Sequence, residues 1–568
     1  MPSIIGKKRG RATYYYLVES ARVGGKPRIV SQEYLGTAGE LAAAMRGGGL
    51  GLPDRVQHKD FGAVAAAWGL LEDLGVASII DEVTGARRSD AGASVGAYLV
   101  LAALNRLVAP CSKLGFADWW AKTAAPRFTR IPASVLDHRR FWDAMHAVEL
   151  SDLDEISQAI ALRTVDLFGL DCSSVALDMT NFATFIDTAN GKAPIAQRGK
   201  AKQKRSDLRL VGLGLVVTRD GGIPMAWHAY PGDKPDVTQF PALIGQLRAR
   251  HDAICDAAGQ PAATDMTVVF DAGQNSGVNF AYLAGTNLRY VGSVPASDCP
   301  DLTALPASVR TVVDQARFGG LTAYDTRRVV YGAERRAILT YSPELRESQA
   351  RGFDGTTLAK AGRKLDELAA TLARGKTRRA REKVEAEIAA ITRKPWVRRV
   401  ITWQLSGERP RDLRLAWGID PDAHAALEEE IFGKHVLITD HDDWPAAEVI
   451  AGYRSQSEAE FSFRQMKDPH VVSFSPMHHW TEHNIRVHVF TCVLALQAAH
   501  LMRLKARRAG LHLSVRELLG ELAAIGETTL LYQTGRGRPR AHRTLTDTSP
   551  VQDKLSEIFG LARYAPRR

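Results

Sequence analysis

Residues 453–467 read YRSQSEAEFSFRQMK, and the interpretation of the whole chain depends on this stretch. An α-helix has 3.6 residues per turn, so Tyr453, Glu460 and Lys467, each seven residues apart, lie on one face of the predicted helix. Arg464 lies one turn from Glu460 on nearly the same face. A carboxylate is therefore flanked by a phenol and two cations. Taken alone, the pattern is most simply explained as a solvated helix with salt pairs between neighbouring turns.

Two aspartates elsewhere in the chain change that interpretation. Asp178 follows the apolar run 175–177 (VAL), and Asp271 follows 268–270 (VVF) just before a glycine turn. The ends of strands in an α/β sheet are where sites are built, and a carboxylate closing an apolar run is poorly explained as surface decoration. For either aspartate alone, a turn or helix-capping role is an equally good explanation. Together with Glu460 they predict a site for two Mg²⁺ ions, which could clamp both oxygens of an in-line phosphoryl displacement.

The composition of the chain narrows its class and its partner. The 568 residues are 45% hydrophobic and 24% charged, as is ordinary for a globular protein of about three or four domains. A net charge of +11 favours an anionic partner, which could be DNA, RNA or an anionic membrane. The five cysteines form no CxxC pair, which argues against a disulfide framework or a zinc knuckle and favours a reducing compartment.

The membrane is the least favoured of these partners. The basic N-terminus continues into Tyr14-Tyr15-Tyr16 where a signal peptide would have its apolar segment. The longest apolar runs, 95–104 and 489–501, are shorter than the ~20 residues of a spanning helix. We therefore expect a cytoplasmic protein with nucleic acid as its partner and no membrane.

The order of the predicted elements indicates an α/β chain with a mainly helical N-terminal region. Residues 1–170 contain a predicted hairpin around Gly24-Gly25 and then helices, and we assign this region to DNA binding or assembly. After residue 171, several β-rich runs precede helices that alternate with strands, which is typical of a mixed sheet. The predicted later regions are an α/β core at 171–295, an insertion with short strands and a helical hairpin at 296–435, the second part of the core at 436–500, and a basic C-terminal region at 501–568.

Basic residues gather in two places. The segment 198–209 carries six cations against the single acid Asp207, and between two predicted core strands it is better explained as a phosphate-contacting loop than as a solvated one. The cations proposed to contact DNA from this loop are Arg198, Lys200, Lys202, Lys204 and Arg205. The second place is the C-terminal region, with 13 Lys and Arg against 6 Asp and Glu, where residues 536–540 (RGRPR) suit a narrow DNA groove or, equally well, a solubilising tail.

Several stretches together resemble the DDE transposases of bacterial insertion sequences, in the IS4-like group and its IS1634-like branch. They are LDMTNF at 177–182, RGKAKQKRSDLRLVGLGLVV at 198–217, GGIPMAWHAYPGDKPD at 221–236, VVFDAGQNS at 268–276, and residues 453–467. That group has a signature of the form Y-x2-R-x3-E-x6-K. Tyr453, Glu460 and Lys467 match it in place, whereas Gln456 occupies the arginine position, so Arg454 or Arg464 is the candidate for that charge.

The resemblance implies an RNase H-like catalytic core split by an insertion. It implies DNA cleavage and strand transfer with two Mg²⁺ ions, for which Mn²⁺ is a possible substitute, held by Asp178, Asp271 and Glu460. The phosphates would be positioned by Tyr453, Arg454, Arg464 and Lys467. The implied partners are the inverted repeats that end the element, the target DNA and a second copy of the chain, with the protein associated with the nucleoid when it is bound to DNA.

Two further sets of residues carry alternatives. Trp396, Trp403 and Trp417 lie in or beside the insertion, where core packing is the simpler role, although related transposases hold a displaced base with an aromatic from this subdomain. The histidines at 478, 479, 483 and 488 have no cysteine nearby and are expected to serve surface and packing roles rather than to bind zinc.

Two other functions stay open. The first alternative is a catalytically inactive, transposase-derived DNA-binding protein or repressor, against which the presence of all three carboxylates argues. The second is a two-metal nuclease without strand transfer, which the insertion and the long resemblance disfavour.

Overall fold

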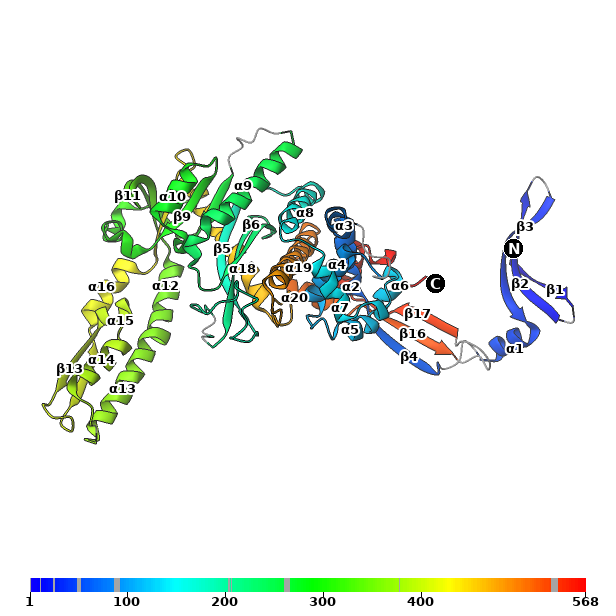
Figure 1. The fold of residues 1–568 in the computed structure, drawn as a ribbon. Coiled ribbons are helices and arrows are strands. Elements are labelled where there is room, and N and C mark those ends of the chain that lie inside the picture. Colours follow the sequence, from blue (N-terminus) through cyan, green and yellow to red (C-terminus); the bar gives the residue numbers. More distant parts are fainter. Residues whose placement is uncertain are drawn as a thin grey trace. The chain divides into compact units, whose positions relative to one another are not determined.

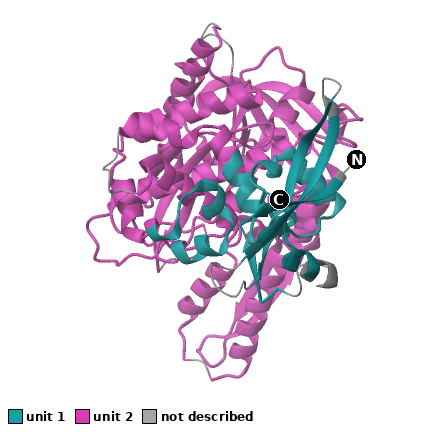
Figure 2. Cartoon of the chain, turned by 90° about the vertical axis from the view of Figure 1, so that its right-hand side faces the viewer, with its two compact units in different colours: residues 1–69, 117–134, 516–568 teal, residues 70–116, 135–515 magenta. Residues whose placement is uncertain are grey.

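The computed structural model describes residues 2–10, 12–23, 26–47, 53–85, 92–202, 205, 207–259, 266–376, 378–532 and 540–567. The chain divides into two compact units (Figure 2). Unit 1 comprises Met1–Gly69, Ala117–Ser134 and Arg516–Arg568, and unit 2 comprises Leu70–Phe116 and Val135–Val515. Because unit 2 holds every residue of the candidate active site, it is described first.

Unit 2 is built on a mixed sheet of nine strands in the order β10-β11-β12-β15-β9-β8-β5-β6-β7 (Figure 1). Strand β5 runs parallel to β8 and β8 runs parallel to β9, whereas the other neighbouring pairs are antiparallel. The strands are β5 (Ser174–Thr184), β6 (Arg209–Thr218), β7 (Pro224–Pro231), β8 (Thr267–Phe270), β9 (Arg289–Val294), β10 (Thr311–Val312), β11 (Thr322–Val330), β12 (Ala333–Tyr341) and β15 (Lys434–Thr439). The mixed α/β class predicted from the sequence is confirmed.

Helices cover both faces of this sheet. Alternate residues of β5 and β8 point to opposite faces, as the pleat requires. Val175, Leu177 and Phe270 pack with α9 (Phe240–Ala257) and α10 (Gly277–Ala284) in one core. On the opposite face, Val269 packs with α17 (Ala446–Arg454), and α18 (Gln456–Lys467) follows α17. Asp178 and Asp271 alternate with the α9 set, so both belong to the α17 and α18 face.

A separate hydrophobic core holds the rest of the insertion together. It is formed by α12 (Pro343–Gly352), the π-helical turn Phe353–Leu358, α13 (Ala359–Ala373), α14 (Arg381–Ile391), α15 (Pro395–Val400), the hairpin β13 (Ile401–Ser406) and β14 (Arg414–Ile419), and α16 (Pro421–Ile431). The helical pair predicted at 360–373 and 378–393 is therefore present as α13 and α14.

The sheet differs from the predicted boundary of this insertion. Strands β10, β11 and β12 fall inside the range 296–435, yet they pair into the main sheet, where β12 joins β15 with Leu339 opposite Val436. Strand alternation shows which face of a strand is buried but does not show which sheet the strand joins. The body with its own core thus begins at α12, after the last of these strands.

The remaining helices of unit 2 pack beside the sheet. They are α3 (Val76–Thr84), α4 (Val95–Val108), α7 (His138–His146), α8 (Asp152–Phe168), the short α11 (Pro300–Thr303) and α19 (Glu482–Arg508). Helix α19 is long and apolar enough to cross a membrane by length and composition, but 94% of its apolar window is buried inside the protein. The bent pair formed by α2 (Gly62–Asp73) and α3 passes the same test of length and composition. The burial of α19 is that of a core helix.

Unit 1 contains two three-stranded sheets. The first is β1 (Pro2–Arg9), β2 (Ala12–Val23) and β3 (Lys26–Thr37), where β2 and β3 form the hairpin predicted around Gly24-Gly25. The second joins β4 (Arg55–Asp60) to β16 (Gly526–Tyr532) and β17 (Arg540–Leu545), so the C-terminal region is folded against residues near the N-terminus. The helices are α1 (Ala38–Gly47), α2 (Gly62–Asp73), α5 (Phe116–Lys122), α6 (Ala125–Thr129), α20 (Val515–Ala523) and α21 (Pro550–Ile558). Of the proposed basic arm 536–540, residues 536–539 lie outside the described residues.

Candidate active site

Two of the predicted carboxylates lie side by side at the centre of the sheet. Strands β5 and β8 are parallel neighbours, and the last paired residues are Leu177 and Phe270. Asp178 and Asp271 are the next residue of each strand, so the register places them next to each other on the same face. Asp271 also caps the short turn that follows β8, because its Oδ1 accepts a hydrogen bond from Gly273 N at 3.0 Å. The capping role and the site role considered from the sequence therefore coexist in one residue.

The charges on these side chains act on one another. Burial, together with the neighbouring carboxylates of Asp271 and Glu460, raises the pKa of Asp178 to about 7. Lys202 and the backbone N–H of Met179 oppose this shift. Asp271 and Glu460 therefore lie close enough to Asp178 to act on its charge, at a position where burial already disfavours the carboxylate form. Such a site favours binding of a proton or a metal cation.

Helix α18 is held against β5 at both of its ends. At the start of the helix, the buried Gln456 donates from Nε2 to the carbonyl oxygen of Leu177 at 2.8 Å. At the end, the ammonium of Lys467 donates to Thr180 Oγ1 at 2.7 Å. Leu177 and Thr180 lie on either side of Asp178 in β5. The two hydrogen bonds therefore hold α18 against the part of the strand that carries this carboxylate. Glu460 lies between the two anchors.

The Lys467 ammonium interacts electrostatically with charged groups of the site. Burial and the neighbouring Lys202 lower its pKa, while Asp178 raises it. It also lies 5.7 Å from the centroid of the Phe182 ring. A half-buried cation this close to Asp178 is suited to hold a phosphate at the carboxylates.

Tyr453 faces the same cluster from α17. Burial raises its pKa to about 12, and the charges of Asp271 and Glu460 contribute to that rise. Its hydroxyl hydrogen-bonds Ser293 on β9, which opposes the shift. The predicted helix 453–467 is interrupted at Ser455, which ends α17 and precedes α18. Tyr453 and Glu460 thus lie on two helices and not on one face of a single helix, although the charge of Glu460 still acts on Tyr453.

The two arginines proposed to replace the missing signature arginine lie elsewhere. The Arg454 guanidinium stacks over the Phe318 ring at 4.5 Å, and Arg454 is exposed. Arg464 is exposed as well, with its guanidinium 5.9 Å from the Phe461 ring centroid. Neither is among the charges that shift the pKa of Asp178, Tyr453 or Lys467. The signature position itself is occupied by Gln456, which serves as a neutral clamp between helix and strand.

One residue of the basic loop, Lys202, lies near the carboxylates. The ammonium of Lys202 forms an ion pair with Asp236 Oδ2 at 2.8 Å and also donates to the carbonyl oxygen of Met179. Arg205 pairs with Asp207, Nη2 to Oδ2, at 2.8 Å. Arg198 and Lys200 are exposed. Lys204 lies outside the described residues.

The tryptophans of the insertion occupy different surroundings. Trp403 and Trp417 are paired across the hairpin β13 and β14. Trp396 packs against Phe353 and Phe432. Trp417 donates from Nε1 to Asp366 Oδ1 at 3.0 Å and lines a cavity of about 690 Å³. That cavity also contains three carboxylates, of Asp354, Asp366 and Glu428, which disfavours a phosphate inside it.

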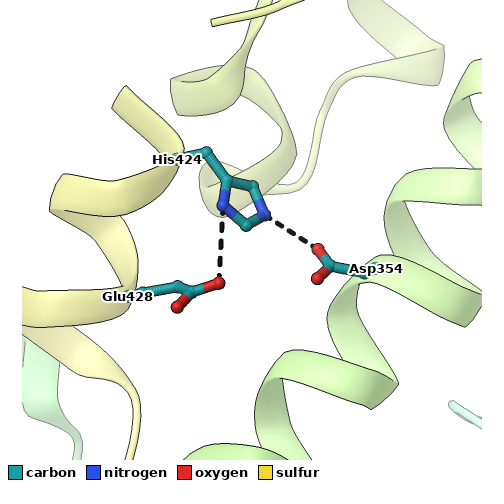
Figure 3. Close-up of side chains that lie close together, drawn as sticks. All are labelled: Asp354, His424 and Glu428. Atoms are coloured by element: carbon teal, nitrogen blue, oxygen red, sulfur yellow. Dashed lines mark hydrogen bonds and ion pairs between the residues drawn. The ribbon is translucent and has the colours of Figure 1, made fainter. Parts of the chain in front are cut away.

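A histidine lies between two of those carboxylates (Figure 3). His424 Nε2 is 2.8 Å from Asp354 Oδ1, and its Nδ1 is 3.5 Å from Glu428 Oε1. The ligand atoms of the three side chains lie within 4.8 Å of one another, close enough to hold a metal ion. The two carboxylates thus face opposite nitrogens of one ring, and each contacts the imidazole directly.

Sequence reasoning missed the residues that support the site. Gln456 was noticed only as a departure from the signature, and its role as a clamp depends on its burial. Thr180 and Ser293 gave no signal, since a single hydroxyl residue in a strand has many uses. The Asp236 partner of Lys202 lies within the quoted stretch 221–236, but its pairing across the loop could not be read from spacing.

Comparisons with known proteins give one solved structure to report. No protein-family model matches the chain, and no curated protein matches it. The chain is similar to the cryo-EM structure of a piggyBac transposase synaptic complex with hairpin DNA, at 8% sequence identity and a TM-score of 0.37, with 82% of each chain covered.

Proposed function

We propose that this protein is a DNA transposase of the IS4-like group, IS1634-like branch, which cleaves the ends of its own element and joins the freed 3′-OH to target DNA. One observation carries the proposal: the carboxylates of Asp178, Asp271 and Glu460 converge from two parallel strands and one helix, and burial together with mutual repulsion raises the pKa of Asp178 to about 7. An electrostatically unfavourable cluster of acids at strand ends marks a functional site more often than a structural one.

The strand order supports an RNase H-like core. Strands β7, β6 and β5 form an antiparallel meander, and β5, β8 and β9 then run parallel. Numbered along the chain within this half of the sheet, the order is 3-2-1-4-5, and the first aspartate lies on the central first strand. The insertion between β9 and β15 separates this half from the helix that carries Glu460, as the resemblance implies.

The donor set fits hard divalent cations. Three carboxylates supply only oxygen ligands, which suit Mg²⁺ and also Mn²⁺, and the surplus negative charge would be offset by two such ions. Asp178, Asp271 and Glu460 would hold them. When bound, the metal ions would supply charge stabilisation of the attacking and leaving oxygens of an in-line displacement.

The surrounding side chains would position the DNA strand. The Lys467 ammonium, held beside Asp178 through Thr180, would bind a phosphate oxygen next to the scissile bond. The Tyr453 hydroxyl would orient a neighbouring phosphate by a hydrogen bond, and it stays protonated because its pKa is about 12. In cleavage a water oxygen bonds to phosphorus and the bond to the 3′ oxygen breaks; in joining, the freed 3′-OH takes the place of water.

The other partners follow from the same proposal. Exposed cations such as Arg198 and Lys200 would contact the DNA backbone outside the site. The resemblance implies a homodimer assembled on paired DNA ends, acting in the bacterial cytoplasm at the nucleoid. The alternative of an inactive DNA-binding remnant or repressor requires no acid cluster, so the surplus charge at Asp178 favours the enzyme.

The experiment that tests the proposal uses the DNA that flanks the coding region. Candidate inverted repeats from both flanks are incubated with the full-length protein and Mg²⁺, and cleavage at the repeat ends is followed on denaturing gels. We expect cutting that requires Mg²⁺ or Mn²⁺ and is followed by joining to a target plasmid. Binding without any cutting would select the repressor, and cutting without joining would select the nuclease.

A further inference from the structure

A cavity of about 260 Å³ lies apart from the carboxylate cluster in unit 2. It is bounded by the loop after α4, by α7, by the segment between α18 and α19, and by the first turn of α19. The residues that carry the argument are Arg106, Lys113, Trp142, His479, Trp480 and Asn484.

Two buried cations at this cavity have no anionic partner among the residues that the structure describes. Lys113 is 9% exposed and Arg106 is 3% exposed. The Lys113 Nζ meets no hydrogen-bond acceptor within the described part of the chain and lies 5.0 Å from the Phe141 ring centroid. Neither cation forms an ion pair with a described residue. Burying charge without pairing is costly, so an arrangement of two such charges points to an anion that completes the site.

Arg106 has donors left over after its structural contacts. Its Nη atoms donate to backbone carbonyls of three residues: Cys111 at 2.9 Å, Ser475 at 3.3 Å and Ser473 at 3.4 Å. Its Nε is buried without an acceptor. The Asn484 Oδ1 is buried without a partner as well, and rotation of that amide would turn its NH₂ donors to the same position. Three of the residues that line the cavity therefore each have a buried polar atom without a hydrogen-bond partner among the described residues.

The electrostatics agree with this geometry. Burial and the Arg106 charge lower the pKa of Lys113 to about 7, and Cys492 and Cys111 oppose this shift. Burial and the charges of Lys113 and Arg106 lower the pKa of His479 to about 3. The potential inside the cavity is thus positive, the reverse of the potential at the carboxylates.

Exposed aromatic rings surround the mouth. Trp142 is 40% exposed and Trp480 is 53% exposed, although indoles of this size are usually buried. The ammonium of Lys192 lies 4.8 Å from the Trp480 ring centroid, so a cation also borders the rim. Exposed aromatics next to cations are how proteins bind single-stranded nucleic acid, because every base offers a face for stacking.

The cavity is coupled to the carboxylate site through packed rings. Phe474, in the wall segment, stacks on Phe182 with ring centroids 4.2 Å apart. Phe182 lies on β5, four residues beyond Asp178, and faces the Lys467 ammonium. The backbone N–H of Phe185 also donates to Met477 O at 3.0 Å. The segment that forms the cavity wall is therefore in direct contact with the strand that carries Asp178.

We propose that this cavity binds the phosphate group of an unpaired nucleotide in a DNA strand. Lys113 and Arg106 contact the phosphate. Trp142 and Trp480 stack on the attached base. The choice of DNA as the source of the phosphate rests on the proposed function, whereas the affinity for phosphate itself does not, and free inorganic phosphate is the other possible source.

The test measures binding, with EDTA present, so that cleavage plays no part. Full-length protein is titrated with a short single-stranded oligonucleotide by fluorescence anisotropy, and with thymidine monophosphate and inorganic phosphate by calorimetry at constant ionic strength. For Lys113→Met we expect affinity for all three ligands to fall about ten- to a hundredfold, as for loss of a charged hydrogen bond. Lys383→Met, which removes an exposed lysine of α14, is the matched control and leaves all three affinities unchanged.

A second variant keeps the result interpretable if the first affects folding. Trp480→Ala alters an exposed side chain and should weaken the oligonucleotide and thymidine monophosphate but leave inorganic phosphate unaffected. Wild-type affinity of Lys113→Met for the oligonucleotide overturns the inference, and so does binding of inorganic phosphate alone. Asp271→Asn should lose cleavage and keep this binding, so failure of the active-site proposal is seen separately from failure of this one.

Discussion

Two sites in unit 2 hold a buried ionisable group whose pKa is shifted toward the neutral form, and the two groups have opposite charge. At the carboxylates, burial and the neighbouring acids raise the pKa of Asp178 to about 7. At the second cavity, burial and the Arg106 charge lower the pKa of Lys113 to about 7. Each group is pushed toward its neutral form mainly by burial. The difference in sign is the reason we propose different ligands, metal cations at one site and phosphate at the other.

The third ionic cluster of unit 2 differs from these two sites, because its ionisable groups contact one another. Around His424, each ring nitrogen has a carboxylate within 3.5 Å. Mutual contacts of this kind are compatible with a purely structural role. The other two sites are therefore the ones to disrupt by mutation.

The largest expected effect is at the carboxylates. Asp178→Asn, Asp271→Asn or Glu460→Gln removes one metal ligand while preserving shape, and each should reduce DNA cleavage by at least about a thousandfold, since the chemistry depends on charge stabilisation at that point. Single-turnover cleavage with Mg²⁺ measures the rate, and anisotropy measures DNA affinity, which should change little. Cleavage by Asp271→Asn at the normal rate would show that the cluster is not the catalytic centre.

The next effect separates Lys467 from the two arginines. Lys467 contacts Thr180 beside Asp178, whereas Arg454 stacks on Phe318 and Arg464 is exposed. We expect Lys467→Ala to lower the cleavage rate about ten- to a hundredfold through loss of a charge-assisted phosphate contact. The same assay should give near wild-type rates for Arg454→Ala and Arg464→Ala. Equal losses for all three variants would mean that the helix surface binds DNA as a whole.

The sequence located the catalytic candidates because they follow simple rules. Asp178 and Asp271 each close an apolar strand, and Glu460 lies in a helix with a sevenfold pattern, so burial and spacing pointed to all three. Gln456 illustrates the limit, because its function as a clamp on Leu177 requires knowing what lies across from it. The placement of β10 to β12 in the main sheet was missed for the same reason, since pairing is a non-local property.

Nothing in the sequence pointed to the cavity for which we propose phosphate binding. Arg106 ends an apolar helix and Lys113 lies in the following loop, positions where cations are usually solvated. The histidines at 478–488 were expected to serve packing or surface roles. His488 is buried and donates from Nε2 to the carbonyl oxygen of Phe474 at 3.0 Å, while His479 lines the cavity. Whether a buried cation has a partner can be seen only when the fold is complete.

Asp178 and Lys113 should change the stability of the fold with opposite pH dependence. Asp178 has a raised pKa in the folded protein, so its charge destabilises the fold above pH 7 and has no effect below about pH 4. Without metal, Asp178→Asn should therefore stabilise unit 2 at pH 8, on the order of 2–4 kcal/mol from a shift of about three pKa units. Thermal unfolding from pH 5 to pH 8 should show this gain growing with pH, and Mg²⁺ should stabilise the wild-type protein more than the variant.

At the cavity, the pH dependence of stability is reversed. The pKa of Lys113 is lowered in the folded protein, so the penalty is complete below pH 7 and disappears above the unfolded value near pH 10.5. Lys113→Met should raise the unfolding temperature most at pH 6 and progressively less toward pH 9, and added phosphate should stabilise only the wild type. A variant less stable than wild type at pH 6 would assign Lys113 a structural role instead.

The smallest expected effect is in the basic loop, and it depends on which cations are already paired. Lys202 is bound to Asp236 and Arg205 to Asp207, so neither is free to replace the counterions that surround DNA. Arg198 and Lys200 are exposed, and each phosphate contact they make should contribute about 0.9 to the slope of log affinity against log salt concentration. Arg198→Ala and Lys200→Ala should therefore each flatten that slope by about one unit, whereas Lys202→Ala should leave it unchanged. An equal change for Lys202→Ala would show that DNA displaces Asp236 from this lysine, and the loop would then rearrange at the carboxylates when DNA binds.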